Sequence, residues 1–125
     1  MKTISEAARE FAVSSRTIRY YEEIGLLKPV RSSTNRRLYS KSEMARLKLI
    51  FRGKRYGFSL DEIKEMVLLF ESDHSGKKQL ERTVEYGTKR IAEIESTIAE
   101  FEALKSEMEG LMEQFQAKLQ QFEGE

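Results

Sequence analysis

The stretch TISEAAREFAVSSRTIRYYEEIGLL, from Thr3 to Leu27, decides the fold, because it has the pattern of two short helices joined by a tight turn. Thr3 is placed to cap the first helix, and Glu6 completes the spacing of a capping box. The pair Ser14-Ser15 offers a second N-cap shortly afterwards. The stretch therefore predicts a helix-turn-helix.

The second of these helices has one buried side and one open side. Ile18 and Tyr21 lie three residues apart and form the predicted buried side. The open face then comprises Arg16, Thr17, Arg19 and Tyr20. An alternative for Tyr20 is a place in the core beside Tyr21. Gly25 is expected to end the helix.

Residues 30–39 have extended ends and a polar middle, which predicts a short two-stranded β-hairpin, or wing. It contains Arg31, Arg36 and Arg37, and it ends at Tyr39. Such arginines are often solvated loop charges. Beside a helix-turn-helix, however, a basic hairpin is suited to straddle a DNA backbone, and that is the function we expect here.

Two more helices come next, and each begins at the spacing of a capping box: Ser40 with Glu43, and Ser59 with Glu62. Lys54 and Arg55 lie near the end of the first of them. The second is expected to reach about Phe70, with this ring facing inward. Residues 1–70 are thus predicted to form one winged helix-turn-helix domain, with a linker over 71–79.

From Leu80 to Phe122, apolar residues recur in steps of four and three over about six heptads without a proline, which is typical of a coiled coil. Such a helix, roughly 65 Å long at 1.5 Å per residue, cannot bury its stripe alone. The sequence therefore predicts a homodimer through residues 80–122. Gly87 and Lys105 interrupt the stripe, either as local irregularities or as a bend, a register point or the edge of a ligand pocket. The predicted dimerisation residues are Leu80, Val84, Ile91, Ile94, Ile98, Phe101, Met108, Met112, Phe115 and Leu119.

The charges are divided unevenly along the chain. Residues 1–70 carry 15 Lys and Arg against 8 Asp and Glu, a balance of +7, whereas residues 71–125 carry 7 against 13, a balance of −6. A basic first part suits a polyanionic partner, and an acidic second part would be repelled by it. The predicted fold class is accordingly mainly α, with a DNA-binding winged helix-turn-helix followed by a long coiled-coil helix.

Other classes of function find little support. The chain has no cysteine, which excludes disulfides and thiolate metal sites, and its one histidine, His74, cannot hold a metal alone. No cofactor, metal or catalytic group is predicted, so we expect no enzyme. Apolar runs are far shorter than the ~20 residues of a membrane span, and the N-terminus does not resemble a signal peptide, which favours the cytoplasm.

Taken in order, five motifs resemble the MerR family of bacterial transcription regulators. They are Ile4-Ser5-Glu6-Ala7-Ala8, Arg16-Thr17-Ile18-Arg19-Tyr20-Tyr21-Glu22, Gly25-Leu26-Leu27, Arg37-Leu38-Tyr39-Ser40 and Gly57-Phe58-Ser59-Leu60-Asp61-Glu62-Ile63. The resemblance covers about residues 3–70, and the long helix is similar to the family's antiparallel dimerisation helix. Many members have Gly-Tyr-Arg where this chain has Asn35-Arg36-Arg37, so the role of that aromatic residue does not carry over.

The resemblance implies a regulator that binds a pseudo-palindromic operator, bends and untwists promoter DNA and acts with RNA polymerase. A coiled-coil interaction module with non-specific nucleic-acid binding is the alternative. Residues 46–55 are similar to a branch that controls branched-chain amino-acid and fatty-acid breakdown, which implies an organic effector such as an acyl-coenzyme A. The predicted DNA-binding residues are Arg16, Thr17, Arg19, Tyr20, Arg31, Arg36, Arg37, Tyr39, Lys54 and Arg55.

Overall fold

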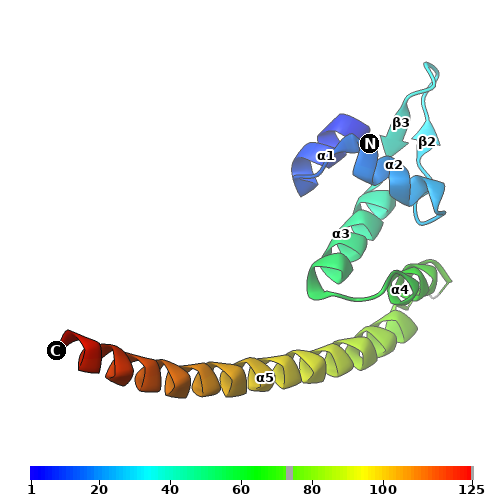
Figure 1. Cartoon of the computed structure of the whole chain (residues 1–125). Helices are drawn as coiled ribbons and strands as arrows, with labels where there is room; N and C mark the ends of the chain where they lie inside the picture. Colours follow the sequence, from blue (N-terminus) through cyan, green and yellow to red (C-terminus); the bar gives the residue numbers. More distant parts are fainter. Residues whose placement is uncertain (73–74, 125) are drawn as a thin grey trace. The chain divides into compact units, whose positions relative to one another are not determined.

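The computed structural model describes residues 1–72 and 75–124, and Figure 1 shows it as a cartoon. Two compact units are present: the first is Met1–Tyr86, and the second begins at Gly87 and consists of the rest of the last helix. His74 lies outside the described residues. The elements are β1 (Lys2–Thr3), α1 (Ile4–Phe11), α2 (Ser15–Glu23), β2 (Val30–Arg31), β3 (Arg37–Tyr39), α3 (Lys41–Tyr56), α4 (Leu60–Ser72) and α5 (Lys77–Glu123).

The two helices of the helix-turn-helix begin at the predicted caps. Thr3 Oγ1 accepts the backbone N–H of Glu6, and the Glu6 carboxylate accepts the N–H of Thr3, so the capping box is confirmed. Ser14 Oγ accepts the backbone N–H of Thr17 at 3.2 Å. The sequence therefore fixes where α1 and α2 start.

Both helices end at a residue in the left-handed conformation. Gly25 has φ +84° and Ala12 has φ +55°. After α2, the N–H of Leu26 bonds to Tyr21 and that of Gly25 to Glu22, which is a Schellman motif. The same pair of bonds closes α1, where an alanine occupies the position that glycine favours.

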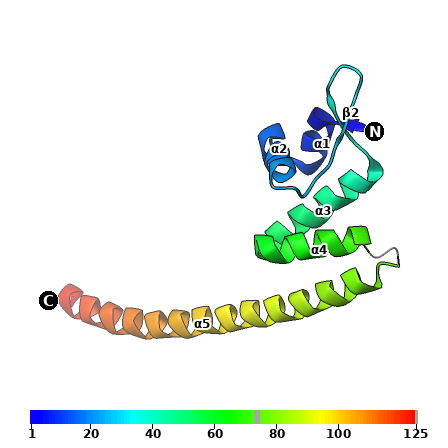
Figure 2. The same cartoon turned by 90° about the vertical axis from the view of Figure 1, so that its right-hand side faces the viewer.

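The wing belongs to a three-stranded antiparallel sheet with the order β1-β3-β2. Val30 pairs with Leu38 and Arg31 with Arg37, as a hairpin requires. Both views show the β2–β3 hairpin projecting from the helices (Figures 1 and 2). β1, which pairs Lys2 with Tyr39, was not predicted, because a two-residue strand carries no alternation of polar and apolar residues.

The core lies between the helix pair, the sheet and the two following helices. α3 and α4 lie side by side (Figure 2). Gly53 permits a close approach, since a Cβ atom there would lie 2.9 Å from Cγ1 of Ile63. The fully buried side chains are Tyr39, Ile18, Leu27, Leu47, Ile50, Ile63 and Val67.

Two predictions about α4 and the connection to α5 were wrong. Phe70 is exposed rather than turned into the core. Periodicity gives the side of a helix on which a residue lies, and it does not give the turn at which the core stops. The connection is also shorter than 71–79, because α4 continues to Ser72 and α5 begins at Lys77.

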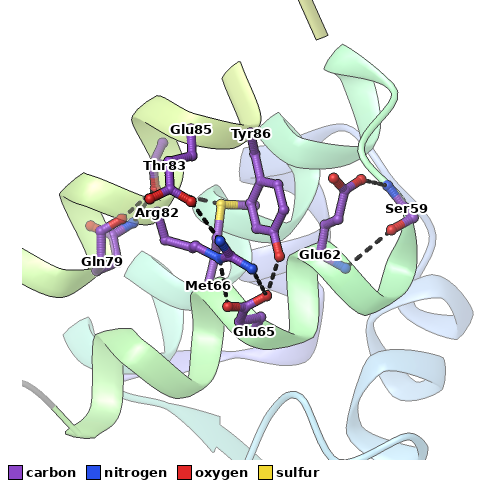
Figure 3. Close-up of polar contacts among 9 residues, drawn as sticks. All are labelled: Ser59, Glu62, Glu65, Met66, Gln79, Arg82, Thr83, Glu85 and Tyr86. Carbon is purple, nitrogen blue, oxygen red and sulfur yellow. Dashed lines mark hydrogen bonds and ion pairs between the residues drawn. The ribbon is translucent and has the colours of Figure 1, made fainter. Parts of the chain in front are cut away.

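The first turns of α5 pack against α4 through a polar cluster (Figure 3). The Glu65 carboxylate accepts hydrogen bonds from Tyr86 Oη and from Arg82 Nε, the latter at 2.6 Å. The Arg82 guanidinium also lies 4.7 Å from the centre of the Tyr86 ring. These contacts hold the pKa of Glu65 below its ordinary 4.5, first through the Tyr86 hydroxyl and then through Arg82.

Candidate nucleic-acid interface

The open face of α2 is built by the burial of its opposite face. Ile18 and Tyr21 are buried against the core, which orients the helix about its own axis. Arg16 and Arg19 are then exposed, and Tyr20 is 48% exposed, as the sequence predicted. Thr17 is half-buried, and its hydroxyl lies 2.9 Å from Ser14 Oγ. The resulting surface offers two guanidinium groups and a phenol as hydrogen-bond donors.

The tip of the wing is a tight turn stabilised by its own polar groups. The N–H of Asn35 bonds to the carbonyl of Ser32 at 2.9 Å, and Ser32 Oγ accepts the N–H of Arg36. Asn35 has φ +61°, a conformation that asparagine tolerates better than most residues. The Arg36 side chain is exposed at this tip.

Arg37 and Arg31 both face Glu22 on α2. Arg37 Nε lies 2.5 Å from Glu22 Oε2, and Arg31 Nη2 lies 3.6 Å from Glu22 Oε1. The Arg37 side chain is half-buried in this pair. Sequence reasoning did not identify Glu22 as a partner, because the residues of the tighter pair are 15 positions apart and no local pattern links them.

Tyr39 is not at the surface, although we expected it to contact the DNA backbone. Its side chain has 0% exposure, and its hydroxyl has no hydrogen-bond partner among the described residues. Burial raises the pKa of Tyr39, and the nearby Glu22 carboxylate adds to the effect. The ring is part of the buried hydrophobic core, together with side chains of the surrounding helices. Tyr39 therefore holds the end of β3 in the core and is not a surface contact.

Lys54 and Arg55 are exposed in the last turn of α3, which ends at Gly57 with φ +84°. Another arginine of this helix was not foreseen as structural. Arg46 forms ion pairs with Glu43 and with Glu71 of α4, the latter at 3.1 Å. The capping box predicted at Ser40 is only half formed. Ser40 Oγ accepts the N–H of Glu43, but the buried Glu43 carboxylate accepts the backbone N–H of Lys28 at 3.0 Å and not that of Ser40.

The predicted dimerisation stripe is exposed in the single chain. Its residues have exposures between 41% and 66%, and no described residue of α5 is buried. Leu104 and Leu111 add to the exposed apolar surface and were missed, because they lie beside the positions reached in steps of four and three. An apolar stripe of this length is typical of a helix that has a partner.

Metal sites and membrane spans are both absent from residues 1–72 and 75–124. This part of the chain contains no group of three His, Cys, Asp or Glu residues that could hold a metal ion. None of its helices is long and apolar enough to cross a membrane.

Comparison with known proteins gives matches over most of the chain. Residues 2–68 match the family model described as MerR HTH family regulatory protein, and residues 44–111 match the one described as MerR, DNA binding. The HTH-type transcriptional regulator HmrR of Sinorhizobium medicae is 35% identical over 96 residues, which are 76% of this chain and 63% of that protein. The HTH-type transcriptional regulator CueR of Salmonella typhi is 35% identical over 99 residues, and the match covers 74% of this chain and 71% of that protein.

Among solved structures, the transcription regulator PbrR691 from Ralstonia metallidurans, crystallised in complex with lead(II), has a TM-score of 0.63 and 31% identity. The match covers 86% of this chain and 83% of that one. This chain spans somewhat less than two thirds of the length of HmrR.

Proposed function

The chain belongs to the MerR family of helix-turn-helix regulatory proteins, and from this premise we propose that it is a transcription regulator that binds double-stranded DNA in a sequence-specific way. One observation carries the proposal: Arg16 and Arg19 project from α2 on the side opposite its buried residues. A helix with this arrangement fits the major groove, where arginine donates two hydrogen bonds to guanine. The role is regulatory and not enzymatic, and it is exercised in the cytoplasm.

The other cations hold the protein on the DNA backbone. Arg36 at the wing tip, and Lys54 and Arg55 at the end of α3, are exposed donors for phosphates. Tyr20 donates its hydroxyl to a phosphate from the edge of α2. Such contacts release counterions, so the affinity falls steeply with salt.

The active form is a homodimer joined through α5. The exposed stripe needs a partner helix, and the charge along α5 favours an antiparallel one. Residues 77–92 carry 5 Lys and Arg against 2 Asp and Glu, whereas residues 93–123 carry 2 against 8. An antiparallel pair apposes the basic start of each helix with the acidic remainder of the other, and a parallel pair apposes like charges.

A two-fold dimer presents two equivalent recognition helices to a pseudo-palindromic operator. Because a stiff coiled coil sets their separation, the DNA adapts by bending and untwisting between the half-sites, at a cost of about 1–6 kcal/mol. RNA polymerase at the promoter is the partner that senses this change.

An organic molecule such as an acyl-coenzyme A is the proposed effector. The solved relative holds lead(II), but soft metals are bound mainly by thiolates and this chain has no cysteine. Binding of acyl-coenzyme A thioesters in a calorimetric titration is the expected result. Control of DNA affinity by sub-micromolar copper or zinc would contradict this part of the proposal.

The decisive test is the Arg16→Ala, Arg19→Ala double variant. The probe is the duplex that the wild-type chain enriches from a randomised pool, compared with a shuffled duplex of the same composition. Each arginine that makes a bidentate base contact contributes about 1–3 kcal/mol, so the double variant should lose its preference for the enriched duplex. A Lys105→Ala, Lys118→Ala variant removes the same charge from the acidic remainder of α5, where the loss does not weaken the proposed antiparallel pairing, and should keep the preference. If the wild-type chain enriches no sequence, it is instead a module with non-specific binding.

A further inference from the structure

We propose that Glu22 is a positioning residue that fixes the wing to α2, the proposed recognition helix. The ability of the protein to distinguish DNA sequences depends on this contact. This inference rests on the proposed function, and it assigns a role to an acidic residue that does not itself contact DNA. The sequence predicted that Arg31 and Arg37 bind phosphates. We infer instead that their ion pairs with Glu22 attach the two strands of the wing to α2.

The geometry joins one carboxylate to both strands of the wing. Glu22 Oε2 lies 2.5 Å from Arg37 Nε on β3, and Glu22 Oε1 lies 3.6 Å from Arg31 Nη2 on β2. Each carboxylate oxygen thus serves one strand. The Glu22 side chain is 22% exposed and that of Arg37 is 27% exposed, so the tighter pair is shielded from water better than an ordinary surface ion pair.

The register of the hairpin explains why a carboxylate is needed at this place. Arg31 and Arg37 are direct cross-strand partners in the β2–β3 pair. Like charges directly opposite each other destabilise a sheet. The Glu22 carboxylate lies against both guanidinium groups and offsets their repulsion.

The pairing with β1 supports only Leu38 and Tyr39 at the base of the wing, and β2 and the wing tip lie outside it. The strands of the wing have two and three residues, and a hairpin of this size is marginally stable on its own. Arg31 extends the connection outward, because its Nη1 donates to the carbonyl of Asn35 at 3.3 Å in the turn that precedes Arg36. A continuous set of contacts therefore runs from α2 through Arg31 to the wing tip.

This arrangement has a consequence for DNA recognition. If Glu22 loses its charge, two guanidinium groups are released toward any phosphate, and the wing tip is no longer held at a fixed distance from α2. Affinity for arbitrary DNA should then rise, because an acidic group has left a basic surface. Discrimination should fall, since the recognition helix and the wing no longer dock as one rigid body.

The test compares Glu22→Gln with Glu23→Gln in the full chain. Glu23 is adjacent, exposed and on the same helix, so both variants remove one negative charge and keep the side-chain shape. Both should bind the shuffled duplex more tightly than the wild-type chain does. Only Glu22→Gln should lower the ratio of affinities for the enriched and shuffled duplexes, by about threefold or more, the size expected for coupling between contacting residues. Hydrogen exchange at the N–H groups of Asn35 and Arg36 should rise in the same variant.

Arg37→Gln gives a second, independent measurement. If Arg37 acts through Glu22, the Glu22→Gln, Arg37→Gln double variant should discriminate no worse than either single variant. Additive losses, or an unchanged ratio in Glu22→Gln, would overturn the positioning role while leaving the proposed function intact. A wild-type chain that enriches no duplex would overturn the proposed function, and this inference with it.

Discussion

At the scale of single residues, the chain shows two departures from the usual residue choices, and both lie in the helix-turn-helix and its support. Ala12 occupies a left-handed position at the turn, where glycine is favoured. Tyr39 buries a hydroxyl that has no partner among the described residues. Each departure lowers stability, so each can be tested by a substitution that removes it.

Replacement of Tyr39 by phenylalanine should stabilise the fold and leave DNA binding unchanged. Removal of an unsatisfied buried hydroxyl should raise the free energy of unfolding by about 1 kcal/mol. Urea denaturation measures the stability, and titration of the enriched duplex measures the affinity. Tyr20→Phe is the matched control, because its exposed hydroxyl is a proposed phosphate donor and its loss should weaken binding. A folded Tyr39→Phe variant with reduced DNA affinity would show that this hydroxyl reaches the backbone, as the sequence had suggested.

Replacement of Ala12 by glycine should also stabilise the protein. The left-handed conformation is costly for a residue with a Cβ atom, and glycine should recover about 0.5–1 kcal/mol at this turn. Gly25→Ala makes the reverse change at φ +84°, with open space around the new methyl group, and should destabilise the protein by a similar amount. Thermal unfolding of both variants decides the matter, and a shift of the same sign in the two would contradict the conformational explanation.

At the scale of helices and strands, local signals were predictable and long-range contacts were not. The sequence located the caps at Thr3 and Ser59, because a capping box spans only four residues, and it placed the cap of α2 at the pair Ser14-Ser15, of which Ser14 is the cap. The wing followed from its polar turn. Three features join residues far apart in the chain, and no local sequence pattern predicts them. They are the Glu22 ion pairs, the strand β1 and the packing of α5 on α4.

The approach of α3 to α4 depends on Gly53. A methyl group at this position would lie 2.9 Å from Ile63 Cγ1, whose side chain is fully buried and has little room to move. Gly53→Ala should therefore cost about 1–3 kcal/mol of stability through overpacking. Gly110→Ala is the control, since nothing lies within 4 Å of the added group, and it should gain roughly 0.5–1 kcal/mol in the helix. Equal effects of the two substitutions on the urea midpoint would exclude a close contact.

The contact between α4 and α5 should make stability depend on pH. The folded-state pKa of Glu65 lies below its ordinary 4.5, because Tyr86 and Arg82 donate to the carboxylate. A lowered pKa contributes stability above the unfolded value, and this stability is lost as the pH falls through the folded value. The wild-type chain should therefore be more stable than Glu65→Gln at pH 7, and the difference should shrink below about pH 4. Urea denaturation at one protein concentration measures this difference in the free energy of unfolding, and Glu81→Gln is the exposed control. A difference between wild type and Glu65→Gln that does not change with pH would contradict the ion-pair explanation.

At the scale of the whole molecule, two features of the chain support the same assembly. The basic residues lie in the part that carries the helix-turn-helix, and the apolar stripe lies on α5. The fold class and the long helix with its exposed apolar stripe could be predicted because each depends on periodicity over many residues. The assignment of Arg31, Arg37 and Tyr39 to DNA contact depended on which way single side chains turn, and tertiary packing decides that.

Measurement of affinity over a series of operator spacings tests the central claim most directly. Duplexes that carry the two enriched half-sites, with one base pair inserted or deleted between them, are titrated with the full chain. A homodimer with recognition helices held apart by a stiff coiled coil predicts tight binding at one spacing, two chains per duplex and a sharp loss of affinity one base pair to either side. Equal affinity at every spacing, or one chain per duplex, would contradict the account.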